Sequence, residues 1–295
     1  MIVCLVLGLL ISLFTIPLVL LPRLMDSIPG RSSGGRRSVR PRPTTAPRFG
    51  GMVLVSCFLG VVVLTSLLQP VAVSGSHLPV LNLVWAALAM AALGAWDDHK
   101  RLSTPHKFLL QAAVAGVLYL TGVQAEKFRA PLDSAFCLES LSNGFVTILW
   151  LVSLTNLVGV IDRVSGLAGA VSLALMTVLA LAGRWAGTEF SALCASGMAG
   201  ALIGFVIYNL PPSRIRLGGS GSGLLGFLLA ALTMLVAAEG TTLATSLTPF
   251  IVITLLVTTA GFAVLRRTLV HPSRPPHAPR AKTAHSAPVS QRRSS

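Results

Sequence analysis

The sequence predicts an all-α membrane protein that crosses the bilayer many times. Its 295 residues are 53% hydrophobic and only 11% charged, and their mean hydropathy is +0.79, far from the composition of a soluble globular domain. Apolar runs long enough to cross a hydrocarbon core of about 30 Å recur along nearly the whole chain. Because lipid offers the backbone no hydrogen-bond partners, such runs must be helices.

The apolar runs predict nine or ten transmembrane helices, with the N-terminus outside. The expected spans are residues 2–22, 50–68, 79–96, 106–122, 144–160, 168–184, 189–208, 223–239 and 245–265. The first run has no basic residue before it and Arg23 after it, so we interpret it as a retained anchor. We expect one transmembrane domain over residues 1–267, with a basic cytoplasmic loop at 23–49, and a disordered basic tail over residues 268–295.

The net charge of +14 is explained by topology. In the orientation above, 20 of the 23 lysines and arginines fall on cytoplasmic segments, as the positive-inside rule predicts. The charge therefore requires no nucleic acid, although the basic segments can also bind anionic headgroups. The four cysteines have no metal-binding spacing. Cys4, Cys57 and Cys194 lie in predicted spans as small core residues, and Cys137 lies in an outer loop.

Acidic residues are few, and those on the cytoplasmic side are the candidates for chemistry. Four of the nine acids are predicted there: Asp26, Asp97, Asp98 and Asp162. The adjacent pair Asp97 and Asp98, in "GAWDDHKRLS", is electrostatically unfavourable unless a cation, a base or open water relieves it. Ionisable groups at membrane depth are functional candidates, whereas the alternative is a solvated helix end neutralised by Lys100 and Arg101.

Lys107 and Gln111 lie four residues apart on the fourth span. They therefore share one helix face, where they can bind each other or a phosphate. Lys107 by itself is more typical of a lysine whose side chain reaches the membrane interface.

Four segments, in this order, together resemble the polyprenyl-phosphate N-acetylhexosamine-1-phosphate transferases. "MDSIPGR" followed by "PRFGG" is similar to the first cytoplasmic loop of that family, lengthened here by an insertion. "GAWDDHKRLSTPHKFLLQ" is similar to its Asp-Asp motif with the following lysine and glutamine. "WLVSLTNLVGVIDRVSGLAGA" and "GFVIYNLPPSRIRLGGSGSGLLG" resemble its third and fourth cytoplasmic blocks.

The resemblance implies transfer of a sugar 1-phosphate from a UDP-sugar to polyprenyl phosphate, with release of UMP. This is a first membrane step of cell-wall or surface polysaccharide synthesis, at the cytoplasmic face of the bacterial inner membrane. The family uses Mg²⁺, and its members are often dimers, so a homodimer is also expected. The implied catalytic residues are Asp97, Asp98 and Asp162, with Asp162 and Asp98 as the candidate metal ligands. The implied substrate-binding residues are Asn156, Lys107, Gln111, Asn209, Ser220, Arg163 and Arg216.

The chain departs from the family pattern at charged positions. Ser165 and Gly219 stand where the family has aspartates, and the second of these is its principal Mg²⁺ ligand. Arg163 replaces a glycine and Arg216 a phenylalanine. Because Mg²⁺ prefers oxygen ligands in near-octahedral geometry, and Gly219 offers no side chain, the metal affinity is expected to fall.

These departures leave three interpretations. The first is a working transferase whose cation is held by the remaining aspartates or replaced by guanidinium groups on the diphosphate. The second is a catalytically impaired relative that binds polyprenyl phosphate or nucleotide as a regulator or partner. The third is an unrelated transporter or channel. The sequence does not identify the UDP-sugar.

Overall fold

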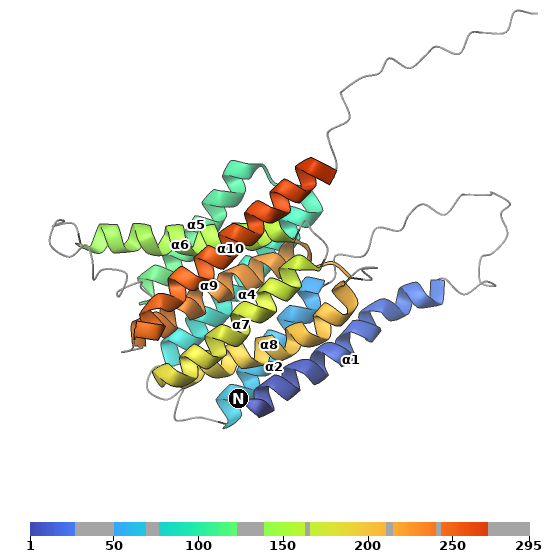
Figure 1. Cartoon of the computed structure of the whole chain (residues 1–295), viewed down its shortest axis with the longest axis horizontal. Coiled ribbons are helices and arrows are strands. Elements are labelled where there is room, and N and C mark those ends of the chain that lie inside the picture. Colours follow the sequence, from blue (N-terminus) through green and yellow to red (C-terminus); the bar gives the residue numbers. More distant parts are fainter. Residues whose placement is uncertain are drawn as a thin grey trace, which may run out of the picture.

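The chain folds into a bundle of helices. A computed structural model describes residues 1–26, 50–68, 77–122, 139–162, 166–210, 215–239 and 243–270, and in these ranges the regular structure is entirely α-helical. In Figure 1, α1 lies along one side of the bundle and α5 and α6 along the other, with α9 between them. This arrangement fits the all-α class that the composition predicts.

The described residues form nine helices. Their bounds are α1 Ile2–Asp26, α2 Gly50–Leu68, α4 His77–Lys100, α5 Thr104–Leu120, α6 Glu139–Ile161, α7 Leu167–Ala186, α8 Glu189–Asn209, α9 Gly218–Glu239 and α10 Leu243–Val270. Each coincides with one expected span, and the ends differ by at most five residues. In these ranges, α2 and α6 to α10 are long and apolar enough to cross a membrane. The chain is therefore a multi-pass membrane protein, and the count of nine spans stays a prediction.

Helix α9 is the centre of the bundle. It packs against α2, α4, α6, α7, α8 and α10. Its apolar stretch Gly218–Ala238 is 89% buried, compared with 33% for the stretch Ser246–Arg266 of α10. Its sequence is apolar or small on every side, and a helix of that kind is stable only when other helices surround it. The position of its first turn therefore depends on its neighbours.

The first turn of α9 is docked closely on α2 and α4 through glycine. A Cβ atom added to Gly94 of α4 would overlap the carbonyl oxygen of Gly219, and one added to Gly51 of α2 would overlap the hydroxyl of Ser220. Small residues at helix contacts let two backbones approach each other in a membrane protein. Here they bring the backbone of α9 against that of α4.

The glycine- and serine-rich stretch is helical, which corrects the expectation of a loop before a span at residue 223. Helix α9 begins at Gly218, whose φ of 74° lies in the left-handed region that glycine adopts at little cost. Glycine disfavours a helix interior in isolation. The close packing on α2 and α4 supplies the stabilisation that this local preference lacks.

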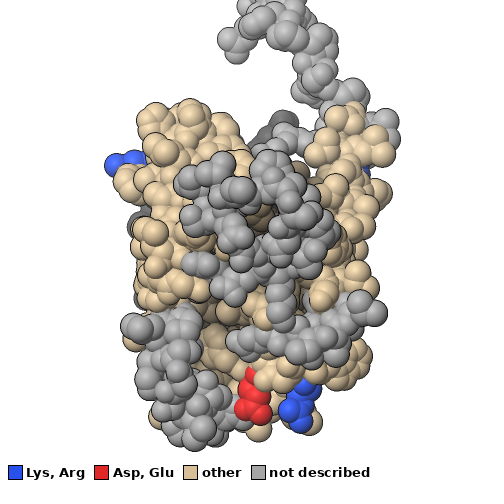
Figure 2. All heavy atoms as spheres, turned by 90° about the vertical axis from the view of Figure 1, so that its left-hand side faces the viewer, with Lys and Arg blue, Asp and Glu red and all other residues tan. Residues whose placement is uncertain are grey.

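The face of the bundle seen in Figure 2 shows few charges among the described residues. In the side view of Figure 2, the visible described atoms are almost all uncharged, and the lysine, arginine and acidic side chains lie near the margins. The expected burial of Cys4, Cys57 and Cys194 is confirmed. Cys137, and most of the basic loop and tail, lie outside the described residues.

Candidate functional site

Four helix ends meet around one cavity of about 450 Å³. They are the C-terminal ends of α4 and α6 and the N-terminal ends of α5 and α9. A volume of this size falls within the range of small-molecule sites, roughly 300–1,000 Å³. The charged side chains that line it are Asp97, Asp98, Lys107, Asp162 and Arg216. Three carboxylates and two cations from segments far apart in sequence thus surround one space.

Asp97 forms an ion pair across the turn between α4 and α5. The ammonium group of Lys107 lies 2.8 Å from its Oδ2 atom, and the two side chains are 29% and 23% exposed respectively. The backbone N–H of Leu102 donates to its Oδ1 atom at 3.1 Å. Arg101, with a φ of 49°, ends α4 and turns the chain back towards α5. Asp97 is therefore paired with Lys107, and not with Lys100 or Arg101 as the alternative interpretation expects.

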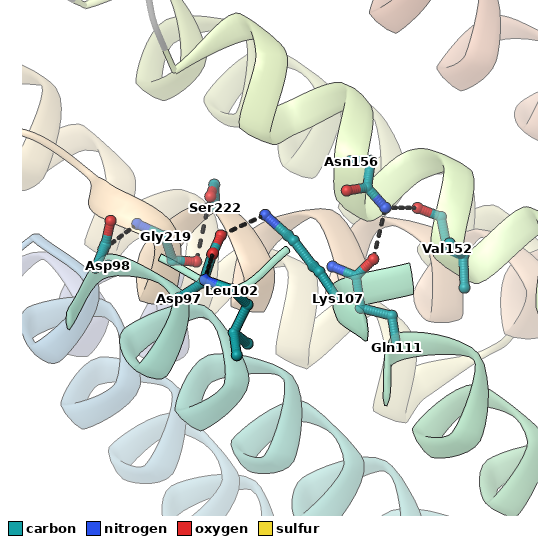
Figure 3. Close-up of polar contacts among 9 residues, drawn as sticks. All are labelled: Asp97, Asp98, Leu102, Lys107, Gln111, Val152, Asn156, Gly219 and Ser222. Carbon is teal, nitrogen blue, oxygen red and sulfur yellow. Dashed lines mark hydrogen bonds and ion pairs between the residues drawn. The ribbon is translucent and has the colours of Figure 1, made fainter. Parts of the chain in front are cut away.

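Asp98 holds the N-terminus of α9. Its Oδ2 atom accepts a hydrogen bond from the backbone N–H of Gly219 at 2.5 Å, and the carbonyl oxygen of Gly219 accepts one from Ser222 Oγ at 3.2 Å. A carboxylate at a helix N-terminus is favoured because the first N–H groups have no partner within the helix. Figure 3 shows this contact beside the ion pair of Asp97.

An uncharged polar pair lines the cavity between α5 and α6. Gln111 is only 3% exposed, and its Oε1 atom accepts a hydrogen bond from Asn156 Nδ2 at 2.6 Å. The same nitrogen donates to the carbonyl of Val152 at 2.8 Å. Figure 3 shows this α5 to α6 contact beside the Lys107 side chain. The expectation that Lys107 and Gln111 share one face is confirmed, because both line the cavity.

Arg216 enters the cavity from the short non-helical segment before α9. Its neighbours Ile215 and Leu217 are fully buried, whereas Arg216 is partly exposed and lines the cavity. Its Nη2 atom donates to the backbone carbonyl of Asp162 at 3.3 Å, and its own carbonyl accepts from Gly50 N–H at 3.1 Å. The start of α2 and the end of α6 thus fix this cation in place.

Two of the expected site residues lie elsewhere. Asn209 is 2% exposed, and its amide lies against Gly169 at the contact of α7 with α8. Ser220 faces Gly51 of α2. Neither lines the cavity, and Arg163 lies outside the described residues.

Ser222 lines the cavity, although Ser220 and not Ser222 was expected among the substrate-binding residues. The sequence indicates this position only when residues 218–222 are known to be helical. In a helix, residues three apart share a face, so Ser222 follows Gly219 to the cavity while Ser220 points away.

The charged residues do not form a metal cluster. In the described ranges, no group of three or more histidine, cysteine or acidic side chains lies close enough to hold an ion. Both oxygens of Asp97 already accept hydrogen bonds, and Asp98 accepts one from Gly219. The arrangement is suited to binding a phosphate between cations and to handling a proton at a carboxylate.

Comparison with known proteins matches a large part of this chain to one family model. The model is described as glycosyl transferase family 4, and it matches residues 80–237, more than half of the chain. The chain belongs to glycosyl transferase family 4. In this family-4 chain, the matched segment runs from α4 to α9 and contains every cavity residue named above.

Similar curated proteins come from bacteria. The "Probable undecaprenyl-phosphate N-acetylglucosaminyl 1-phosphate transferase" of Bacillus subtilis is 28% identical over 272 residues, which cover 90% of this chain and 72% of that protein. The "Phospho-N-acetylmuramoyl-pentapeptide-transferase" of Staphylococcus saprophyticus is 26% identical and that of Staphylococcus haemolyticus 27% identical. Each alignment covers 79% of this chain and 76% of the relative. The resemblance to this family of membrane transferases is thereby confirmed.

Proposed function

We propose that this chain transfers a sugar 1-phosphate of the N-acetylhexosamine class from a UDP-sugar to a polyprenyl phosphate such as undecaprenyl phosphate. The observation that carries the proposal is the cavity itself, in which Asp97, Asp98, Asp162, Lys107 and Arg216 meet at the ends of four helices. The names of the similar proteins describe transfer to polyprenyl lipid and support the same reaction class.

The reaction joins two anions, so the protein must supply positive charge. An oxygen of the polyprenyl phosphate attacks the phosphorus that bears the sugar. A new P–O bond forms to the lipid, the P–O bond to the other phosphate breaks, and UMP leaves with that bond's electron pair. Catalysis of phosphoryl transfer rests on positioning and on neutralising the developing charge. Lys107 and Arg216 are the described cavity side chains that can do so.

The carboxylates take the complementary role. Asp97 and Asp98 act on the polyprenyl phosphate or its proton, and Lys107, paired with Asp97 at 2.8 Å, can contact the phosphate as it enters. Asp162 and Asn156 position the nucleotide and sugar, and Gln111 fixes the Asn156 amide by the 2.6 Å hydrogen bond. A general acid or base must reach the proton it transfers, and these side chains line the same cavity.

The family resemblance also implies Mg²⁺, which would neutralise charge on the diphosphate. Asp162 and Asp98 are the candidate ligands. In the described part of the chain, however, the acidic residues form no group able to hold a metal, and position 219 has no side chain. The described residues therefore offer no preformed cluster of three ligands for a resident ion, and no step above uses one.

The proposal places the protein in a bacterial inner membrane, with the cavity on the cytoplasmic side. Lys100 and Lys107 lie at the cavity ends of α4 and α5, and Arg101 and Arg216 lie just outside the cavity ends of α4 and α9. Arg184 lies at the C-terminal end of α7, away from the end that starts beside α6. This bias follows the positive-inside rule. The product would serve cell-wall or surface polysaccharide synthesis, and a homodimer in the membrane is part of the proposal.

Turnover by the purified protein is the direct test. Protein in detergent is mixed with undecaprenyl phosphate and either UDP-N-acetylglucosamine or UDP-N-acetylmuramoyl-pentapeptide, and UMP and the lipid product are quantified. Asp97→Asn should lower turnover by about 100-fold or more, because it removes a charged group from the reacting centre. Glu189→Gln is the matched control, since Glu189 lies at the start of α8 and outside the cavity. Full activity of Asp97→Asn would remove this residue from the mechanism.

A second result would overturn the assignment of this chain as a transferase. If neither UDP-sugar yields UMP or lipid product, with or without Mg²⁺, the proposed reaction fails. Retained binding of polyprenyl phosphate or UDP would then support the alternative, a relative that binds these ligands without turning them over.

A further inference from the structure

A side chain at position 219 would require α9 or α4 to shift from its place in this structure. A Cβ atom there would lie 2.5 Å from the carbonyl oxygen of Gly94 and 3.0 Å from Asp98 Oδ2. The first contact is with backbone, which cannot rotate away as a flexible side chain can. The first turn of α9 therefore meets α4 through its backbone, and glycine at position 219 is required by that contact.

The carboxylates at this end of the cavity are already engaged within the protein. Asp98 accepts the N–H of Gly219 and so holds α9 in place. Asp97 accepts Leu102 N–H with one oxygen and Lys107 with the other. Mg²⁺ demands near-octahedral oxygen ligands and gives up its water reluctantly. An ion bound by these two carboxylates would have to share oxygens that already accept the hydrogen bonds holding α5 and α9.

Arg216 is held so that its charge faces the cavity. The contact that positions its guanidinium is a backbone carbonyl, that of Asp162 at 3.3 Å, and a carbonyl carries no net charge to cancel that of the arginine. The residues on either side are fully buried, which fixes the backbone. A planar guanidinium binds phosphate oxygens by paired hydrogen bonds.

We propose that this cavity binds the diphosphate of its nucleotide substrate through Arg216, without a resident divalent cation. The inference rests on the proposed function and deepens it, because it assigns the charge-neutralising role to this guanidinium with Lys107 as the second cation. Arg216 is preorganised by Gly50, Ile215, Leu217 and Asp162, so little rotational freedom is lost when an anion binds.

The test measures binding of UDP to the purified protein in detergent by isothermal titration calorimetry, once in EDTA and once in Mg²⁺. The dissociation constants in the two buffers should agree within about threefold. Arg216→Gln should weaken UDP binding by about 10- to 100-fold in both, the usual effect of removing a hydrogen bond to a charged group. The UDP affinity of Arg216→Lys should lie between those of the parent and Arg216→Gln, because lysine keeps the charge and loses the planar guanidinium.

Arg266→Gln is the matched control, because Arg266 is exposed near the C-terminal end of α10 and does not line the cavity. Its UDP affinity should equal that of the parent. Thermal unfolding of each variant separates lost binding from lost folding. UDP binding that disappears in EDTA, or that survives in folded Arg216→Gln, overturns the inference.

Turnover measured in parallel distinguishes this inference from the proposed function. UDP binding that requires Mg²⁺, together with measurable UMP release, would overturn metal-free binding and leave the transferase assignment intact. UDP binding in EDTA that depends on Arg216, without turnover under any condition, would support the site and overturn the reaction.

Discussion

The two sides of the cavity are built in different ways. On the α4 and α9 side, backbone meets backbone at Gly94 and Gly219, and Asp98 closes the contact with one short hydrogen bond. On the α5 and α6 side, long side chains bridge the helices, with Gln111 bonded to Asn156. Backbone contact leaves almost no adjustable atoms, whereas side chains can rotate when a ligand enters. One side therefore fixes the geometry, and the other can adapt to the substrate.

Gly219→Asp should produce the largest effect, on the rigid side. A carboxylate at a helix N-terminus gains about 0.3–1 kcal/mol from the helix dipole. Overpacking against the Gly94 carbonyl costs about 1–3 kcal/mol, and the new charge stands beside Asp98. The cost is larger than the gain, so the variant should melt at lower temperature and should not acquire Mg²⁺ binding. Thermal unfolding in detergent with and without Mg²⁺ measures both.

Gly261→Ala is the control for that substitution, since no atom lies within 4 Å of a Cβ atom there, and it should unfold at or above the parent temperature. A stable Gly219→Asp protein whose melting temperature rises with Mg²⁺ would show that α9 can move away from α4. The description of the α4 and α9 side as rigid would then be wrong.

Lys107→Met should separate activity from stability on the adaptable side. The ion pair with Asp97 is partly exposed, so its loss should change the free energy of unfolding by no more than about 1 kcal/mol. Loss of a cation at the phosphate should lower turnover by about 100-fold. Lys100→Met is the matched control, because Lys100 is exposed, lies 5.9 Å from the Trp96 ring centre and is outside the cavity. Equal turnover of the two variants would contradict the assignment of Lys107.

Gln111→Leu and Asn156→Leu test whether the α5 to α6 bridge acts as a pair. Asn156→Leu leaves the buried amide of Gln111 without this partner and should cost about 1–3 kcal/mol of unfolding free energy. Gln111→Leu should cost less, because Asn156 is partly exposed and keeps its bond to Val152. The double variant removes both groups and should cost less than the sum of the two. A double-mutant cycle from chemical denaturation measures the coupling, expected at about 0.5–3 kcal/mol. Additive effects would mean that the 2.6 Å contact contributes no coupling.

Ser222→Ala should have the smallest effect. Its hydroxyl donates to the carbonyl of Gly219 at 3.2 Å, and such a bond contributes about 0.5–1.5 kcal/mol net. Stability should fall by no more than that, and turnover should change less than threefold. Ser56→Ala on α2, where an exposed hydroxyl donates to Met52 at 3.0 Å, is the control. A tenfold loss of turnover specific to Ser222→Ala would place this hydroxyl on the substrate.

Much of the candidate site could be predicted from local patterns and from the family resemblance. Asp97, Asp98, Lys107, Gln111, Asn156, Asp162 and Arg216 were all expected, and all line one cavity. Their roles remain predictions. Ser220 and Asn209 were expected there too, but they lie against Gly51 and Gly169 instead. A motif gives the order of residues but not the helical phase that decides which of two nearby serines faces the substrate.

The sequence by itself determined that this is an all-helical membrane protein with its charges at the helix ends, because apolar runs of this length are stable only as helices in lipid. It also determined the family, through the order of the polar blocks. Only the tertiary structure decided that the glycine-rich stretch is the first turn of α9, that Asp98 holds that turn and that Arg216 is fixed towards the cavity. The physical reason is that these features depend on contacts between segments more than 50 residues apart, such as Arg216 with Asp162 and Asp98 with Gly219.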